Sequence, residues 1–335
     1  MSQEMQIAWQ KTSASDGVRI LRVYSHSPEI MIPDRIAGLP VKEIGAYCFS
    51  SSEKQAKGET FLSDFDAFLQ ESNTSAFSQN NLKFSPACGN FISELTIPDS
   101  VTILHNAAFY NCRKLSRLSF GPCICGIGSD EFTNCQKLKY LNIRADIGAP
   151  TALKTILERI ETELFVSFSD ANGILSSELY FPEYYEWLDE ISPAHIFSRS
   201  IHGEGYRMRK SFDDRILNYA KYDDCFHSAL NNETDASIIN IALFRLLYPN
   251  KLEDAAKELY QKALSDRSTL AFSNIIKDRH SDMLLFLLRQ LCHDSSDFTP
   301  VLLSCSEAGW AEGAALVMEA QQKLSKRKPK TFSFD

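Results

Sequence analysis

The chain has 335 residues, of which 44% are hydrophobic and 23% are charged. These values match ordinary globular usage and exclude a largely disordered chain, and the length predicts two domains because single cores stop growing at a few hundred residues. The formal net charge of −8 opposes the phosphate backbone of a nucleic acid. We therefore expect a folded protein of two domains with no nucleic acid among its partners.

Targeting and redox signals predict a cytoplasmic protein. The N-terminus carries acidic Glu4 and lacks the basic and then apolar pattern of a signal peptide. The apolar run Met283 to Leu288 is far shorter than the roughly 20 residues that span a bilayer, so we expect no membrane partner. Nine cysteines, an odd number spread along a long chain, are typical of reduced thiols rather than of a disulfide framework.

Two stretches of the N-terminal half repeat each other with a period of 23 residues. Five positions recur in one register: Phe109, Cys112, Leu115, Leu118 and Phe120 correspond to Phe132, Cys135, Leu138, Leu141 and Ile143. A further step back from Leu118 reaches Leu95, which indicates a third strand. The period and the Leu-x-x-Leu-x-apolar strand are typical of leucine-rich repeats, in which each turn buries its apolar ladder against its neighbours.

Several elements of residues 5–145 resemble the BspA-like leucine-rich repeat family of bacteria. They are the Ile97-Pro98-Asp99 turn, the run Ile44-Gly45-Ala46-Tyr47-Cys48-Phe49 and two Asn-Cys-x-x-Leu-x-x-Leu segments that begin at Asn111 and Asn134. The resemblance implies an α/β solenoid, a right half-horseshoe over residues 1–148, with residues 29–49 as its first repeat. Many family members are secreted adhesins, but the missing export signal means that this role is not carried over.

An insertion interrupts the repeats at about residues 50–84. Its apolar residues are spaced for one face of a short helix; they are Phe61, Leu62, Phe65, Phe68 and Leu69. A packed lid is one interpretation of this helix and a docking site for a partner is the other, because insertions in solenoids map to one face.

The periodicity changes after residue 148, and residues 149–210 are expected to form a capping or joint region. Pro150 begins a helical pattern that includes Leu153, Ile156, Leu157 and Ile160, and a short strand is predicted at 163–168. Residues 179–210 are aromatic and are expected to be irregular.

Residues 211–322 are predicted to form an all-α domain of paired helical repeats. The segment from Phe298 resembles an ankyrin repeat, with Thr299-Pro300 in place of the Thr-Pro-Leu-His turn and Gly309 at the end of the first helix. A step of 30 residues pairs Thr269 with Thr299. The basic residues 323–335 are expected to form a flexible tail.

Candidate catalytic and metal sites are weak. Cys112, Cys123, Cys125 and Cys135 suggest zinc, but one intervening residue between Cys123 and Cys125 is too few for a usual ligand pair, which favours structural thiols. The sequence contains neither a Gly-x-Ser-x-Gly elbow nor a phosphate-binding loop. We therefore predict that the protein is not an enzyme and that it binds no cofactor and no metal.

The most unusual polar cluster lies in the joint region. Its residues are His202, Glu204, Tyr206, Arg207 and Arg209. Arginine forks of this kind bind carboxylates and other anions. A polar network between the two domains is the alternative, and it is the one that we favour.

The sequence as a whole predicts a non-catalytic scaffold or adaptor that binds an unidentified protein partner. This prediction rests on two repeat arrays, because stacked repeats present extended binding surfaces. The alternative is a sensor or enzyme-accessory protein that binds a small anionic ligand at the interdomain joint. A third hypothesis is an adhesin or effector that is exported by a non-standard route.

Overall fold

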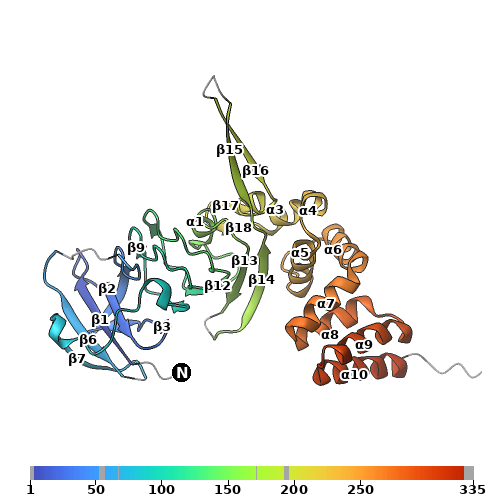
Figure 1. Ribbon diagram of the computed structural model, residues 1–335, viewed down its shortest axis with the longest axis horizontal. Helices are drawn as coiled ribbons and strands as arrows, with labels where there is room; N and C mark the ends of the chain where they lie inside the picture. Colours follow the sequence, from blue (N-terminus) through green and yellow to red (C-terminus); the bar gives the residue numbers. More distant parts are fainter. Residues whose placement is uncertain (1–3, 53–56, 67, 171, 192–195, 328–335) are drawn as a thin grey trace, which may run out of the picture. The chain divides into compact units, whose positions relative to one another are not determined.

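The structure is a computed structural model that describes residues 4–52, 57–66, 68–170, 172–191 and 196–327. The chain divides into two compact units, Met1–Cys225 (unit 1) and Phe226–Asp335 (unit 2). Figure 1 shows that unit 1 is built mainly of strands and unit 2 of helices. The predicted solenoid followed by a helical region is therefore confirmed.

Two sheets form the solenoid of unit 1. The six-stranded sheet has the order β14-β13-β12-β10-β8-β3. Its strands are β3 (Glu29–Met31), β8 (Glu94–Thr96), β10 (Arg117–Phe120), β12 (Tyr140–Arg144), β13 (Leu164–Ser169) and β14 (Leu175–Phe181). The second sheet follows the order β11-β9-β5-β2-β1-β6-β7, with β4 (Arg35–Ile36) beside β5. Its strands are β1 (Met5–Lys11), β2 (Val18–Ser25), β5 (Leu39–Ile44), β6 (Phe61–Phe65), β7 (Glu71–Ala76), β9 (Ile103–Leu104) and β11 (Gly126–Ile127).

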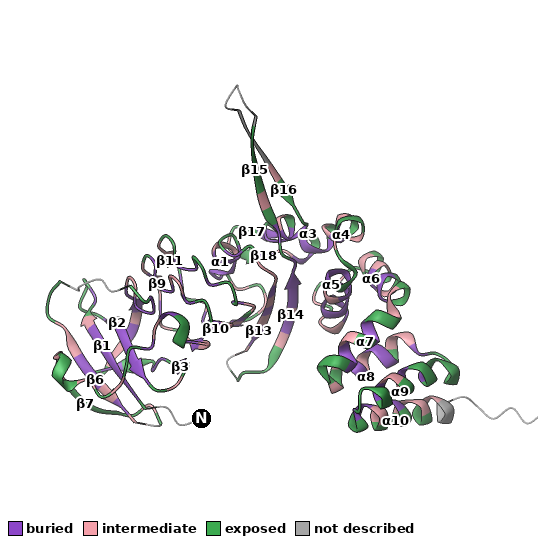
Figure 2. Ribbon diagram, in the orientation of Figure 1, coloured by how far each residue is buried: buried purple, intermediate pink, exposed green. Residues whose placement is uncertain are grey.

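The strand register confirms the 23-residue repeat. Leu118 lies opposite Leu95 on one side and Leu141 on the other, and both pairings are parallel. All three leucines are buried. Figure 2 shows buried segments along strands of both sheets, for example on β1, β2 and β14. The expected first repeat is confirmed too, because Ile30 of β3 pairs with Leu95.

The corners between strands explain why the repeat uses Asn and Cys. Asn111 and Asn134 have φ of 63° and 64°, a left-handed conformation that Asn tolerates better than most residues. The Asn134 side-chain amide also donates to the Asn111 side-chain oxygen at 2.7 Å. Beneath them, Phe109 stacks on Phe132 with ring centroids 5.4 Å apart, so each corner supports the next.

A short helix and an antiparallel strand close the end of the solenoid. Helix α1 (Leu153–Leu157) buries Leu153, Ile156 and Leu157, and β13 pairs in parallel with β12. Strand β14 then runs antiparallel to β13 and ends the parallel ladder. Unit 1 also contains the 3₁₀ turns η1 (Gln79–Asn81) and η2 (Gly89–Phe91), α2 (Gly205–Met208), β17 (Phe212–Asp213), β18 (Ile216–Leu217) and α3 (Tyr219–Asp224), besides two strands that are described below.

The prediction of a helix in the insertion is wrong. The residues form the antiparallel strands β6 and β7, and β6 pairs with β1 from Met5↔Phe65 to Trp9↔Phe61. Leu62 packs on Ala8 of β1, whereas Phe68 is 81% exposed. Pairing with a distant strand decided the conformation, and it overrode a local spacing that also fits a helix. Residues 53–56 and 67 of the predicted insertion lie outside the described residues.

The irregular structure expected for residues 179–210 is wrong as well. The segment contains the end of β14, the strands β15 (Tyr185–Ile191) and β16 (Ile196–His202), and α2. Strands β15 and β16 pair only with each other among the described residues. Apolar residues occur on both of their faces, so the period-2 pattern of a half-buried strand is absent from the sequence.

Unit 2 is helical throughout its described residues. Its helices are α4 (Phe226–Asn232), α5 (Asp235–Leu247), α6 (Asp254–Asp266), α7 (Ser268–Asp278), α8 (Ser281–Leu291), α9 (Phe298–Glu307) and α10 (Ala311–Arg327), with the 3₁₀ turn η3 (Ser295–Asp297) before α9. Helix α10 includes residues 323–327 of the predicted flexible tail, and residues 328–335 lie outside the described part.

The predicted step of 30 residues relates the two helix pairs of unit 2. Arg279 ends α7 at φ 54° and Gly309 follows α9 at φ 61°. The next backbone amide donates to a carbonyl five residues back in both cases, from His280 to Ile275 and from Trp310 to Cys305. This pattern closes a helix end with a left-handed residue. The two pairs are thus copies of one helical unit.

Candidate functional site

A row of aromatic and cationic side chains crosses the face of the six-stranded sheet opposite its leucine core. This aromatic row consists of Arg117, Tyr140, Phe165 and Tyr180, one residue from each of four neighbouring strands. The Arg117 guanidinium lies 4.6 Å from the centroid of the Tyr140 ring. The Tyr140 ring stacks on Phe165 at 5.4 Å, and Phe165 meets Tyr180 at 5.0 Å.

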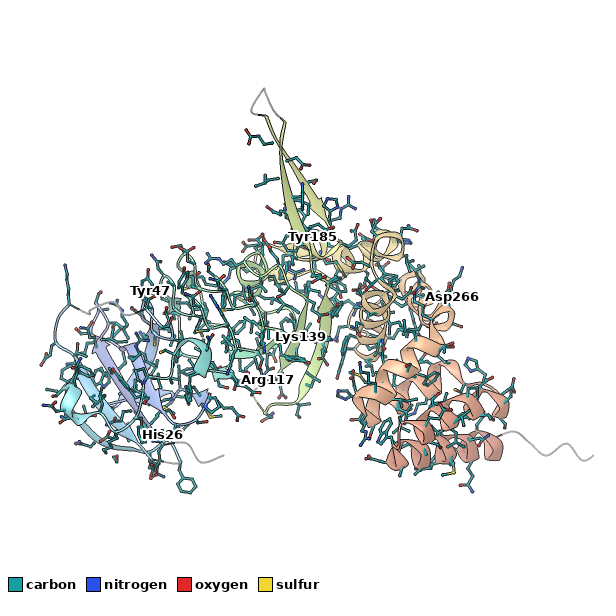
Figure 3. The ribbon with its side chains drawn as sticks, in the orientation of Figure 1. His26, Tyr47, Arg117, Lys139, Tyr185 and Asp266 are labelled. Carbon is teal, nitrogen blue, oxygen red and sulfur yellow. The ribbon has the colours of Figure 1, made fainter. Side chains whose placement is uncertain are left out.

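The neighbours of the aromatic row hold its side chains in place. Lys139 pairs with Glu163 at 2.5 Å, and its ammonium lies 5.4 Å from the Phe165 ring. The Tyr180 hydroxyl donates to Glu163 at 2.8 Å. Arg117 and Tyr140 are exposed, Tyr140 by 36%, whereas Phe165 is half-buried and Tyr180 is buried. The row therefore presents its Arg117 and Tyr140 end to solvent. Figure 3 labels Arg117 and Lys139 on this part of unit 1.

A second, polar row lies beside the first on the same sheet. The Asn142 amide donates to the Ser119 hydroxyl at 2.9 Å, and the Ser167 hydroxyl donates to the Asn142 oxygen at 3.2 Å. Glu178 lies opposite Ser167 on β14 and completes this polar row. The rows therefore combine apolar contact area with hydrogen-bonding groups, which is the composition of a protein-binding surface.

Burial raises the pKa of the Glu178 carboxyl from 4.5 to about 7, although Arg117 opposes the shift. A carboxyl with a raised pKa in the folded state stabilises the fold fully below its unfolded pKa. That stability is lost as the pH rises through the folded pKa. For Glu178 the loss falls between about pH 4.5 and pH 7, so the charge of the polar row changes near neutrality.

A cavity of about 490 Å³ lies at the edge of the polar row, where β3, β8 and β12 end. Met31, Thr96 and Arg144 line it from the sheet, and Leu69 lines it from the turn between β6 and β7. The Arg144 guanidinium forms a salt bridge with Asp99 at 2.7 Å, so its charge is already paired. The insertion therefore borders the same face as the two rows.

The five residues of the predicted joint site all lie in unit 1, where their side chains have different environments. Arg209 is 1% exposed and points inward. It donates to the carbonyls of Ile160 at 3.0 Å, Thr162 at 2.6 Å, Pro182 at 2.5 Å and Gly205 at 3.0 Å. Its guanidinium therefore ties the end of the solenoid to α2. These contacts place Arg209 in a polar network inside unit 1, whereas the network expected from the sequence lay between the two domains.

The other four residues occupy different environments. Glu204 is buried and lies 3.9 Å from the exposed guanidinium of Arg207. The Tyr206 ring packs on Tyr184 at 5.5 Å. His202 lies at the end of β16, where its ring stacks on Tyr185 at 5.0 Å. Binding of a small anion here stays a prediction.

The cysteines considered for zinc are of two kinds. Cys112 and Cys135 are buried and donate their thiols to the carbonyls of Phe49 and Phe109, each at 3.1 Å. Burial raises the pKa of the Cys135 thiol to about 12, so the thiolate that zinc requires is disfavoured. Cys123 and Cys125 are exposed. In the described part of the chain, no group of three or more His, Cys, Asp or Glu side chains is placed to hold a metal ion.

Sequence reasoning missed the aromatic and polar rows, although a signal was present. Glu94, Arg117 and Tyr140 are spaced by 23 residues, as are Thr96, Ser119 and Asn142. These positions alternate with the leucines that define the repeat, so they had to share the opposite face of the sheet.

The parallel ladders and their 23-residue step define a repeat solenoid in unit 1. Residues 86–151 match the family described as "BspA type Leucine rich repeat region (6 copies)". A crystal structure of a T. pallidum leucine-rich repeat protein is similar at 18% identity. The match covers 40% of this chain and 67% of that chain, with a TM-score of 0.22. A comparison with curated proteins found no match. None of the helices in the described residues is both long and apolar enough to span a membrane.

Proposed function

We propose that this protein is a non-catalytic interaction scaffold of the cytosol that binds a protein partner across the aromatic and polar rows. The observation that carries the proposal is the stack of the exposed Arg117 and Tyr140 on the half-buried Phe165 of a hydrogen-bonded sheet. Tyr and Arg are the residues that most often dominate the binding energy of protein interfaces. Leucine-rich repeats in general mediate protein–protein interactions, which supports the same function.

Preorganisation supports this choice of face. Lys139, Glu163 and Tyr180 restrain the row before any partner arrives, so less side-chain entropy is lost on binding. All nine cysteines are free thiols, which fits a reducing compartment. In our proposal unit 2 is an ankyrin-like array that offers a second surface, as the 30-residue repeat of its helices suggests.

The proposal is tested by affinity capture of the tagged full-length protein from its own cell lysate, followed by mass spectrometry. The test variant is Arg117→Glu, and the matched control is Lys137→Glu, which makes the same charge change at an exposed corner of the next repeat. We expect Arg117→Glu to weaken the binding of a stoichiometric partner by about tenfold or more, a loss of about 1.4 kcal/mol in binding free energy. The control should retain the partner.

Two results would contradict the proposed function. One is a partner that both variants retain equally, because the rows are then not the contact surface. The other is a wild-type protein that captures no stoichiometric partner.

A further inference from the structure

Strands β15 and β16 form a separate two-stranded sheet, which we call the arm. Its pairs run from Tyr185↔His202 to Ile191↔Ile196. At about 3.4 Å per residue, seven residues extend about 24 Å. Figure 1 shows the arm standing away from the six-stranded sheet of unit 1. Both edges of the arm lack a neighbouring strand within the described part of the chain.

The base of the arm is fixed, so the arm is a built element rather than a loose loop. The Tyr184 amide donates to the carbonyl of Glu161 at 3.0 Å. Gly203 follows β16 with φ 93°, and a Cβ atom there would lie 2.7 Å from the carbonyl oxygen of Glu183. Only glycine fits this close approach of the two backbone segments at the base of the arm.

The arm exposes large apolar side chains on both of its faces. Tyr185 and Trp187 lie on one face and are each 56% exposed. Leu188 is 65% exposed and Ile201 is 37% exposed on the other face. A two-stranded hairpin is only marginally stable alone in water, and it gains stability from a third strand or a packed surface. Exposed Trp and Tyr at an open sheet edge therefore indicate a docking element.

The net charge of the arm indicates which kind of partner it can bind. Residues 183–202 carry the acidic side chains Glu183, Glu186, Asp189 and Glu190 against the single cation Arg199. This net negative charge repels nucleic acids, anionic lipids and the arm of a second copy of this chain. It attracts a segment that is rich in Lys or Arg.

We propose that the arm binds a basic, extended segment of a protein partner, which adds to the edge of β15 as a third strand. Main-chain hydrogen bonds to an open edge supply affinity, and alternate side chains supply specificity. Lysines of the added strand lie on the face of Glu186 and Glu190, and its apolar residues lie on the face of Tyr185 and Trp187. The arm is separate from the aromatic and polar rows, so this proposal extends the proposed function to a second surface.

The probe is a fluorescein-labelled peptide of about eight residues in which Lys and Val alternate, titrated with the full-length protein and followed by fluorescence anisotropy. Two control peptides are used. In one, Glu replaces every Lys. In the other, the same lysines and valines are arranged in two blocks, which keeps the charge and removes the alternation.

We expect saturable binding of the alternating Lys-Val peptide and at least about tenfold weaker binding of both control peptides. Trp187→Ser and Glu186→Lys each weaken binding by about tenfold. Leu303→Ser, at a 59% exposed leucine of unit 2, is the matched control and leaves binding unchanged. Circular dichroism verifies that all variants are folded. N-methylation of alternate peptide amides abolishes binding, because it removes the donors of the added strand.

The proposal is overturned if the alternating peptide does not bind, if the block peptide binds equally well, or if Trp187→Ser binds like the wild type. Arg117→Glu retains the peptide if the arm acts independently of the two rows. A failure of the arm is thereby distinguished from a failure of the proposed function.

Discussion

Replacement of Arg209 tests whether this residue organises the fold or binds a ligand. Arg209→Met keeps much of the side-chain volume and removes the hydrogen bonds to the carbonyls of Ile160, Thr162, Pro182 and Gly205. A buried polar group left without a partner costs about 1–3 kcal/mol. Because the carbonyls can relax toward water in part, we expect a total loss of about 3–5 kcal/mol.

The assay is thermal unfolding of the full-length protein followed by circular dichroism. For a unit of about 225 residues, each kcal/mol lowers the midpoint by about 2–4 °C, so Arg209→Met should melt about 10 °C earlier. Arg209→Lys should lose about half as much, because an ammonium lacks the planar fork. Arg207→Ala is the matched control, because its side chain is exposed two residues away, and it should be nearly neutral.

The structural role of Arg209 is refuted if Arg209→Met melts within about 2 °C of the wild type, a range typical of surface substitutions. The small-anion hypothesis makes a different prediction. In that case phosphate or sulfate raises the free energy of unfolding of the wild type by about 2.7 kcal/mol at a hundredfold excess over the dissociation constant, and its melting midpoint rises accordingly. Arg209→Met abolishes this shift.

Three further predictions concern charge, backbone strain and packing. Glu178→Gln should be more stable than the wild type by about 1–2 kcal/mol at pH 8 and equal to it at about pH 4, as measured by urea unfolding, and a difference independent of pH would contradict the raised pKa. Arg279→Gly should stabilise unit 2 by about 0.5–1 kcal/mol and Gly309→Ala should destabilise it by about 1 kcal/mol, since both residues are left-handed; melting midpoints that move in the same direction would count against this reasoning. Phe109→Ala should cost about 3–5 kcal/mol in urea unfolding because it opens the stack between Phe49 and Phe132, and a cost below about 1 kcal/mol would show that the stack does not support the solenoid.

Several features of the candidate site followed from the sequence only in part. The 23-residue period placed Leu118 beside Leu141, and the alternation of a strand then places Arg117 and Tyr140 on the opposite face. The sequence did not indicate that Phe165 and Tyr180 continue this row. The strands that carry them lie outside the repeat, so only their pairing with β12 reveals the alignment.

Arg209 illustrates a limit of composition-based reasoning about sites. A cluster of His, Glu, Tyr and Arg looks the same in a sequence whether its arginine meets a ligand or backbone carbonyls. The decision depends on where Ile160, Thr162 and Pro182 lie after folding, and they are 27 to 49 residues away along the chain. Long-range contacts of this kind leave no local periodicity.

The sequence by itself determined the repeats, since both the 23-residue ladder and the 30-residue helical step depend on neighbours that are related by a fixed offset. Only the tertiary structure decided the conformation of Phe61–Phe65 and of the arm. In the first case the backbone hydrogen bonds are made to β1, more than fifty residues earlier. In the second, the apolar residues of β15 face solvent on both sides. Local periodicity in a sequence indicates which face of an element is buried. It gives no indication where a strand pairs with a distant segment or buries neither face.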